Sequence, residues 1–282
     1  MNVKEKRQKL KELMISPGCT PAIGVYDAIS AKVVEKTGFD VAYLGSYATA
    51  ASVFGFPDVG AVTMTEMAEH AKHVAACVDI PLICDAENGF FHSANIWRTV
   101  KEFETAGVSA IHIEDHEFGK HTQLTPIILD ADKSCKKIEA ALAARTDDDF
   151  MIIARTDALW AFGDMNEAAR RANLYLQAGA DAVFIAAYSK TLTADLRKMI
   201  NGPVIAVNSG GTSIQEENDK GINIALYWPL TLYAALVASR EACERFRETQ
   251  NYNQMGKYVY NEQELNEYIP FTGFLDRVWK YL

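Results

Sequence analysis

Short apolar runs alternate with longer segments of helical spacing along this chain. Eight runs are rich in apolar and β-branched residues, which is typical of strands buried on both faces. They lie near residues 22–25, 41–45, 81–85, 110–114, 151–155, 182–186, 203–207 and 222–227. The segments between them space apolar residues by three and four, as in Trp97, Val100 and Phe103, which predicts amphipathic helices. The pattern therefore predicts strands and helices in strict alternation.

Four helix-to-strand junctions repeat one local pattern. Each has a glycine, which can end a helix in the left-handed conformation, and a polar residue two positions later that begins the turn into the strand. The glycines are Gly38, Gly107, Gly179 and Gly221. Such repetition favours a (β/α)8 TIM-type barrel as one domain over residues 1–282. We also expect a helix at about 3–14 and a helical extension at about 229–282. An open doubly wound sheet is the alternative, but no GxGxxG follows the first predicted strand.

Charge and cysteine content exclude several classes of protein. There are 28 Lys and Arg residues against 37 Asp and Glu residues, a formal net charge of −9, which disfavours binding to nucleic acid. No apolar run approaches the roughly 20 residues that cross a bilayer, so we expect no membrane partner. Five cysteines without a CxxC pair indicate reduced thiols rather than a disulfide framework. We therefore expect a cytoplasmic protein.

Polar residues end several of the predicted strands. In a barrel of this kind the carboxyl ends of the strands face the active site. Because side chains alternate along a strand, Asp85 and Glu87 share a face with Ile83, while Cys84 points to the helices. The candidate residues at the strand ends are Asp85, Glu87, Glu114, Arg155 and Asn208.

Converging carboxylates repel one another unless a cation lies among them. Oxygen ligands without a His or Cys partner favour Mg²⁺, with Mn²⁺ as an alternative. The predicted metal residues are Asp58, Asp85, Glu87 and Glu114. Helix capping or turn roles remain open for some of them. Arg155 can clamp a substrate carboxylate through its planar fork, or form a structural ion pair with Asp157 or Glu114.

The long connection after the fourth strand gathers polar residues. Lys120 and Thr122 lie in a run, residues 117–124, that could close over a substrate and exclude water. A plain surface loop is the alternative. The histidines give no separable signal, and His112 reads as an interior residue.

Five ordered segments resemble the isocitrate lyase/phosphoenolpyruvate mutase superfamily. They are residues 24–32, 57–58, 85–89, 113–115 and 153–158. The resemblance implies a barrel whose last helix is swapped between subunits of a homodimer or homotetramer, and Mg²⁺-dependent chemistry through an enolate intermediate. It also implies that Asp85 holds the metal directly, and that Asp58, Glu87 and Glu114 hold it largely through waters.

The same resemblance assigns the substrate-binding residues. Residues 43–47 resemble the segment whose backbone amides bind a substrate carboxylate or oxyanion, and Arg155 resembles the arginine that contacts it. The predicted substrate-binding residues are Tyr43, Gly45, Ser46, Arg155 and Asn208. The predicted catalytic residues are Lys120, Thr122 and Arg155.

This chain departs from the sequence patterns of individual branches of the superfamily, and these differences bear on which reaction we expect. The lyases carry a cysteine where this chain has Thr122, and a threonine hydroxyl is too weak an acid to replace a tuned thiol. The run around Lys120 resembles the lid of phosphonopyruvate hydrolase and phosphoenolpyruvate mutase. The fifth strand, however, reads Ala-Arg-Thr-Asp-Ala and the sixth ends without histidine, as in oxaloacetate decarboxylases.

The sequence therefore predicts a Mg²⁺-dependent C–C lyase or decarboxylase. Its substrate would be a small 2-oxo or 2-hydroxy dicarboxylic acid. The alternative enzyme class is P–C bond chemistry, as in phosphonopyruvate hydrolysis or phosphoenolpyruvate mutation. A barrel retained for ligand binding without catalysis is the third hypothesis.

Overall fold

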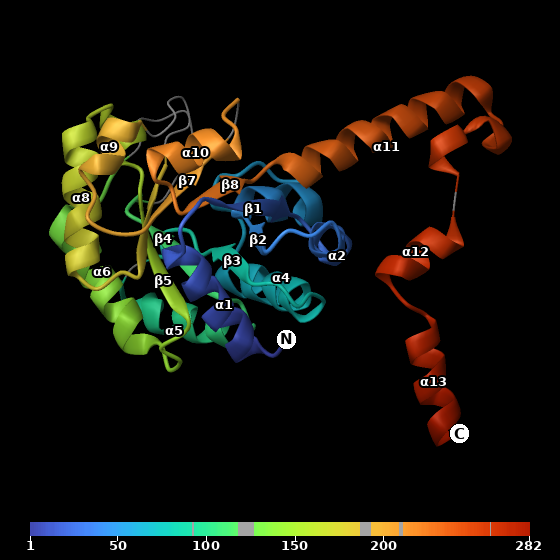
Figure 1. Cartoon of the computed structure of the whole chain (residues 1–282), viewed down its shortest axis with the longest axis horizontal. Helices are drawn as coiled ribbons and strands as arrows, with labels where there is room; N and C mark the ends of the chain where they lie inside the picture. Colours follow the sequence, from blue (N-terminus) through green and yellow to red (C-terminus); the bar gives the residue numbers. More distant parts are fainter. Residues whose placement is uncertain (92, 118–126, 187–192, 209–210, 260) are drawn as a thin grey trace. The chain divides into compact units, whose positions relative to one another are not determined.

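Eight parallel strands close into a barrel with helices around the outside, as the computed structural model shows (Figure 1). The structure describes residues 1–91, 93–117, 127–186, 193–208, 211–259 and 261–282. The strands are β1 Thr20–Val25, β2 Val41–Leu44, β3 Leu82–Asp85, β4 Ala110–Glu114, β5 Met151–Thr156, β6 Ala182–Ile185, β7 Val204–Val207 and β8 Ile224–Tyr227. The predicted TIM-type barrel and its eight strands are confirmed.

One helix precedes the first strand, and at least one helix follows each strand in chain order. The helices are α1 Val3–Ile15, α2 Ala28–Lys36, α3 Ser46–Thr49, α4 Met64–Ala76, α5 Ser93–Thr105, α6 Ala131–Ala144, α7 Ala158–Phe162, α8 Met165–Gln177, α9 Ala194–Lys198, α10 Ile214–Lys220, α11 Leu230–Thr249, α12 Glu262–Tyr268 and α13 Thr272–Tyr281. A π-helical turn, Ala50–Phe54, continues α3. Helix α1 covers the stretch near residues 3–14 in which the sequence predicts a helix.

The first and last strands complete the barrel. Thr20 of β1 pairs with Ile224 of β8, and Ile23 pairs with Tyr227. Gly24 lies so close to the segment after β8 that a Cβ there would overlap the backbone of Trp228. The lack of a side chain at Gly24 therefore allows the barrel to close at this point.

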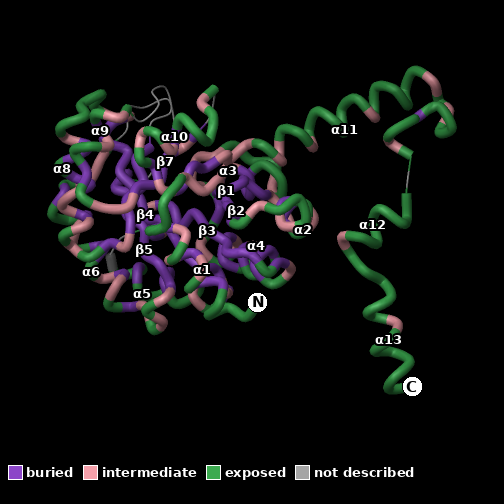
Figure 2. The backbone as a smooth tube through the Cα atoms, viewed as in Figure 1, coloured by how far each residue is buried: buried purple, intermediate pink, exposed green. Residues whose placement is uncertain are grey.

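Alternation along the strands divides the buried residues into two groups. One group, which includes Cys84, Ile111 and Ile152, packs against the surrounding helices. The other, which includes Ile83 and Ile153, fills the barrel interior. The predicted faces are confirmed: Cys84 belongs to the helix-facing group, and Asp85 follows on the interior face. Figure 2 shows the strands almost wholly buried.

Helix α1 closes the amino end of the barrel. Its Leu10 and Met14 are buried among the first inward residues of the strands, such as Ala110 and Met151. The capping box between Asn2 and Glu5 starts the helix. This apolar closure leaves the carboxyl end of the barrel as the polar end.

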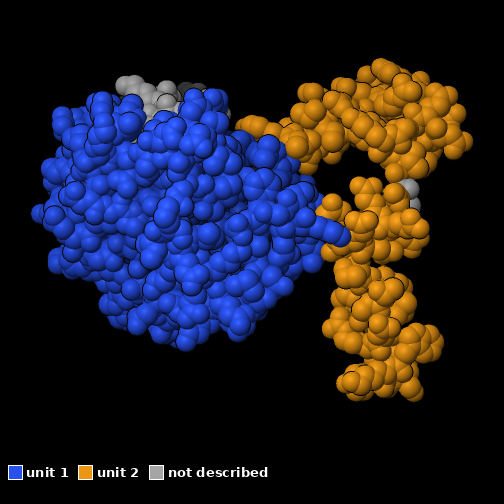
Figure 3. Space-filling model, viewed as in Figure 1, with its two compact units in different colours: residues 1–231 blue, residues 232–282 orange. Residues whose placement is uncertain are grey.

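The chain divides into two compact units, Met1–Thr231 and Leu232–Leu282 (Figure 3). The first unit contains the whole barrel. The second contains most of α11 together with α12 and α13, and most of its described residues are exposed in the single chain. Among the described helices, none is both long and apolar enough to cross a membrane.

Candidate active site

Three buried carboxylates converge at the carboxyl end of the barrel. Asp85 ends β3, Glu114 ends β4, and Glu87 lies in the loop just after β3. One carboxylate oxygen from each lies within 4.8 Å of the others, and the residues are only 2 to 7% exposed. Negative charges this close, removed from water, need a compensating cation. The donor set contains oxygen only, which suits Mg²⁺.

The backbone holds this cluster in place. Glu87 has φ 49°, in the left-handed region that side chains other than glycine rarely adopt. Its N–H donates to Asp85 Oδ1 at 2.8 Å, and its carbonyl accepts from the N–H of Glu114 at 2.9 Å. The unusual conformation of Glu87 thus connects the ends of two neighbouring strands at the cluster.

Ser46, at the start of α3, links the cluster to Asp58. Its hydroxyl lies 2.9 Å from Asp85 Oδ2 and 3.2 Å from Asp58 Oδ1. Its N–H donates to the same Asp85 oxygen at 3.4 Å. Asp58, predicted from sequence as a metal residue, is therefore connected to Asp85 through the Ser46 hydroxyl. The structure brings all four predicted metal residues to one place.

Tyr43 and His112 lie beneath Asp85 inside the barrel. The Tyr43 hydroxyl and His112 Nε2 are 3.1 Å apart, and His112 Nδ1 is 3.7 Å from Asp85 Oδ1. A Cβ on Gly45 would come within 3.1 Å of the Tyr43 ring, so the small residue allows close approach there. His112 is interior, as expected, and lies next to Asp85.

Arg155 bridges two carboxylates on the opposite side of the cluster. Its Nε and Nη2 donate to the two oxygens of Asp157 at 2.7 and 3.1 Å, and Nη1 lies 3.2 Å from Glu114 Oε2. The guanidinium carbon also lies 5.2 Å from the centre of the Phe184 ring. The sequence left open whether Arg155 pairs with Asp157 or with Glu114, and the structure contains both ion pairs. Arg155 therefore faces the carboxylate cluster with a fixed positive charge.

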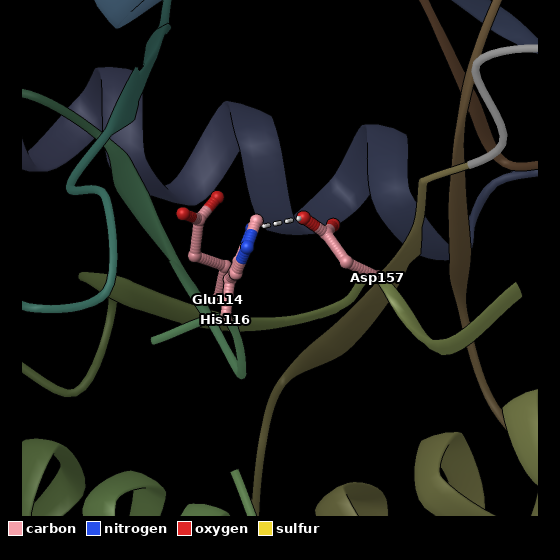
Figure 4. Close-up of side chains that lie close together, drawn as sticks. All are labelled: Glu114, His116 and Asp157. Atoms are coloured by element: carbon pink, nitrogen blue, oxygen red, sulfur yellow. Dashed lines mark ion pairs between the residues drawn. The ribbon is translucent and has the colours of Figure 1, made fainter. Parts of the chain in front are cut away.

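Sequence reasoning missed the contribution of His116. The side chain is 3% exposed, its Nδ1 lies 3.3 Å from Asp157 Oδ2, and its ring meets Trp160 edge-on. Figure 4 shows the His116 ring between the carboxylates of Glu114 and Asp157. These three could ligate a metal by proximity alone. Arg155 already supplies the positive charge to both carboxylates, so we interpret this group as an ion-pair network.

A second buried network lies behind Arg155. Asp115 accepts hydrogen bonds from the Thr156 and Tyr175 hydroxyls, both at 2.8 Å, and from the N–H of Asp157 at 2.9 Å. Burial, reinforced by the charge of Asp157, raises the pKa of the Asp115 carboxyl. Arg171 Nη1 contacts the same carboxylate at 3.3 Å. This network fixes the backbone that carries Asp157.

The remaining predicted residues lie elsewhere or outside the described chain. Asn208 is buried at the end of β7, where its amide nitrogen donates to the Thr212 carbonyl at 2.7 Å and approaches the Tyr227 hydroxyl at 3.3 Å. The described contacts of Asn208 thus run toward the start of α10. Lys120 and Thr122 lie outside the described residues.

Comparisons with known proteins identify relatives of this chain. A family model described as phosphoenolpyruvate phosphomutase matches residues 10–247. A 2,3-dimethylmalate lyase from Eubacterium barkeri is 36% identical over 238 residues, 82% of each chain. An oxaloacetate decarboxylase from Bradyrhizobium diazoefficiens is 31% identical over 88% of this chain and 87% of its own.

A solved structure extends the similarity to the whole fold. Phosphonopyruvate hydrolase in complex with oxalate and Mg²⁺ superposes with a TM-score of 0.89 at 29% identity, covering 100% of this chain and 99% of its own. The chain therefore belongs to the phosphoenolpyruvate mutase/isocitrate lyase superfamily. The family resemblance predicted from five sequence segments is confirmed.

Proposed function

We propose that this protein is a Mg²⁺-dependent C–C lyase or decarboxylase. Its substrate would be a small 2-oxo or 2-hydroxy dicarboxylic acid, cleaved through an enolate-like state. The observation that carries the proposal is the convergence of Asp85, Glu87 and Glu114 opposite Arg155. The lyase and decarboxylase names of two relatives support the same class of reaction.

The donor set fits the metal. Asp85 would bind it directly, and Glu87, Glu114 and Asp58 would hold its water ligands, since Mg²⁺ in proteins usually keeps several waters. The bound ion would supply positive charge for the oxygen on which negative charge develops during cleavage. Ser46 would orient Asp85 and Asp58 through its hydroxyl.

The protein's own groups would bind the substrate. Arg155 would attract a substrate carboxylate while Asp157 and Glu114 hold its fork in place. The backbone at Tyr43, Gly45 and Ser46, beside Asp85, would provide hydrogen-bond donors. Lys120 and Thr122 would cover the substrate and exclude water. Asn208 would contribute from β7.

Phosphorus–carbon chemistry is a second candidate. The similarity to phosphonopyruvate hydrolase over the full chain favours it. In that case Lys120 and Thr122 would hold a phosphonate group. The two reactions share the metal residues and differ in the bond that breaks.

One experiment separates these candidates. Purified protein with Mg²⁺ would be followed by proton and phosphorus NMR in the presence of oxaloacetate, phosphonopyruvate, 2-methylisocitrate or 2,3-dimethylmalate. We expect loss of a carbon acid and appearance of an oxo acid, abolished by EDTA and restored by Mg²⁺. Inorganic phosphate or phosphoenolpyruvate would instead establish the phosphorus reaction. Oxalate binding without any turnover would establish a non-catalytic barrel.

We further propose a cytoplasmic homodimer or homotetramer in which the segment after residue 229 packs against another subunit. Exposed apolar residues on α11 and α13, such as Leu236, Phe274 and Trp279, support this arrangement. Light scattering of the full chain would measure the assembly. A monomer at micromolar concentration would contradict it.

A further inference from the structure

A cavity opens beside the carboxylate cluster, between the start of α4, the loop after β3 and the first turns of α5. Its volume is about 400 Å³, within the range of small-molecule sites. Glu87 and Glu114 line it, so it is continuous with the proposed metal site. A cavity of this size exceeds the needs of a four-carbon acid, since pockets of this range enclose most of a drug-sized ligand.

The loop after β3 forms one wall in an unusual conformation. Phe90 has φ 56° and Phe91 has φ 113°, both in the region that favours glycine. Such backbone costs conformational free energy, persists only where the surroundings enforce it, and is concentrated at functional sites. Both residues lie beyond the end of β3, outside the strands that form the barrel.

Surrounding residues hold this loop from several sides. The Asn95 amide donates to the Phe90 carbonyl at 2.8 Å, and the Thr99 hydroxyl donates to the Gly89 carbonyl at 3.0 Å. The Lys137 ammonium donates to the Asn88 carbonyl at 2.8 Å. The Phe90 ring also stacks on Phe103 of α5. The wall of the cavity is therefore preformed.

The lining combines apolar surface, three carboxylates and one cationic group. Val62, Met64 and Phe90 contribute the apolar part. Arg98 contributes the only positive charge among the described lining residues, and its Nη2 lies 3.5 Å from the Thr65 hydroxyl. Its competing partner, Glu102, is 3.6 Å away in an exposed pair, which contributes little and can be exchanged for another carboxylate.

We propose that this cavity binds a distal arm of the substrate, an apolar chain of several carbons that ends in a carboxylate paired with Arg98. The reacting 2-oxo or 2-hydroxy acid would lie at Asp85, Glu87 and Glu114, so the inference rests on the proposed function and narrows its substrate class. The chain packs on Val62, Met64 and Phe90. Its terminal carboxylate accepts from the Arg98 guanidinium and the Thr65 hydroxyl. The preferred acids are therefore longer than oxaloacetate.

Calorimetric titration in the presence of Mg²⁺ tests this arm directly. The probes are oxaloacetate, 2-oxoadipate and 2-oxopimelate, with 2-oxohexanoate and 2-oxoheptanoate as chains of equal length without the distal carboxylate. We expect the long diacids to bind the protein at least 10-fold more tightly than oxaloacetate and the matched mono-acids. Equal affinity of the protein for all five acids would contradict the proposal that the cavity binds a distal arm of the substrate.

Variants locate the distal carboxylate. Arg98→Ala should weaken binding of 2-oxopimelate by about 10- to 100-fold, as expected for a charge-assisted hydrogen bond, and leave oxaloacetate unchanged. Arg98→Lys should restore part of the loss. Lys101→Ala removes a charge from the same helix outside the cavity and should change nothing. An Arg98→Ala protein that binds all probes like wild type would overturn the assignment.

The two proposals fail in different ways. If oxaloacetate binds with Mg²⁺ and the long diacids bind no more tightly, the proposal of a distal arm is wrong and the proposed function stands. If no 2-oxo acid binds in the presence of Mg²⁺, and neither 2-methylisocitrate nor 2,3-dimethylmalate binds, both proposals are wrong. Thr65 is exposed and lines the cavity. Thr65→Trp should block binding of the long diacids and leave oxaloacetate binding intact. If the variant binds both kinds of acid as wild type does, the distal arm does not pass Thr65.

Discussion

The two ends of the barrel are built from opposite kinds of residues. At the amino end, Leu10 and Met14 of α1 are 0 and 1% exposed and fill the interior with apolar surface. At the carboxyl end the equally buried side chains are charged, as at Asp85, Glu114 and Arg155. The amino end thus stabilises the fold, while the carboxyl end places charges at a cost in stability.

The cationic residues of the two ends also differ in their partners. On α1, Lys6 donates to the carbonyls of Ala75 and Val78, so backbone groups hold its ammonium. Arg7 donates to the Val108 carbonyl and also pairs with the Asp147 carboxylate at 2.7 Å. Arg155 instead faces carboxylates that can exchange partners when a substrate or metal arrives. The contrast is therefore clearest between Lys6, held by two carbonyls, and Arg155, held by two carboxylates beside the proposed metal site.

The largest effect should come from Asp85→Asn. We expect Mg²⁺-dependent turnover to fall by more than about 100-fold, since even residues that only support metal ligands account for 10- to 100-fold. The melting temperature in EDTA should stay equal or rise, because one of three crowded negative charges is lost. Turnover assays and thermal melts measure the two effects. Asp195→Asn, at an exposed position, is the matched control. Full activity in both variants would mean that Asp85 does not bind the metal.

At the opposite end, Leu10→Ala should lower the free energy of unfolding by about 2–5 kcal/mol, because a buried side chain is replaced by a cavity. The turnover number per folded molecule should stay unchanged. Urea unfolding gives the stability and substrate saturation gives the activity. Ile15→Ala on the same helix, 75% exposed, should change neither. A large loss of turnover in Leu10→Ala without loss of stability would contradict the conclusion that the amino end serves stability rather than activity.

The Arg155→Lys substitution tests the fork itself. Lysine keeps the charge but cannot contact both Asp157 oxygens and Glu114 together, so kcat/KM should fall by about 10- to 150-fold, equivalent to about 1.5–3 kcal/mol. Arg170→Lys is a close control, since Arg170 holds Glu167 through the same fork at the surface, where such pairs contribute little. Equal kinetics in the two variants would mean that Arg155 does not touch substrate.

The smallest effect concerns Glu167, which holds Arg171 behind the site. Hydrogen bonds from Arg170 and Arg171 lower the pKa of Glu167 from 4.5 to about 2. Its contribution to stability is therefore present above pH 4.5 and lost as the pH falls to about 2. Near the solvent this amounts to about 1 kcal/mol or less.

The variant Glu167→Gln should remove that dependence on pH. Urea midpoints of wild type and variant should differ at pH 7 and converge toward pH 2. Glu69→Gln, at an exposed position of α4, serves as the control. A constant difference across this range would mean that the ion pair does not stabilise the fold.

The sequence predicted the barrel because its signals are local. Alternation along each strand placed Asp85 and Arg155 inward, and the common edge of parallel strands brought Glu87 and Glu114 together. The contacts of His116 with Asp157 were not predictable, since both residues lie past the strand ends, where no periodicity applies. The left-handed conformation of Phe90 depends on α5 and could not be inferred from an aromatic residue.

Closure of the barrel has a consequence for synthesis. The β1 strand cannot complete its hydrogen bonds until β8, about 200 positions later, has left the ribosome. At about 5–20 residues per second, this interval lasts roughly 10–40 s. Throughout it one edge of β1 has no strand partner and can pair with another nascent chain. Chaperone demand during translation should therefore fall sharply once residue 227 emerges.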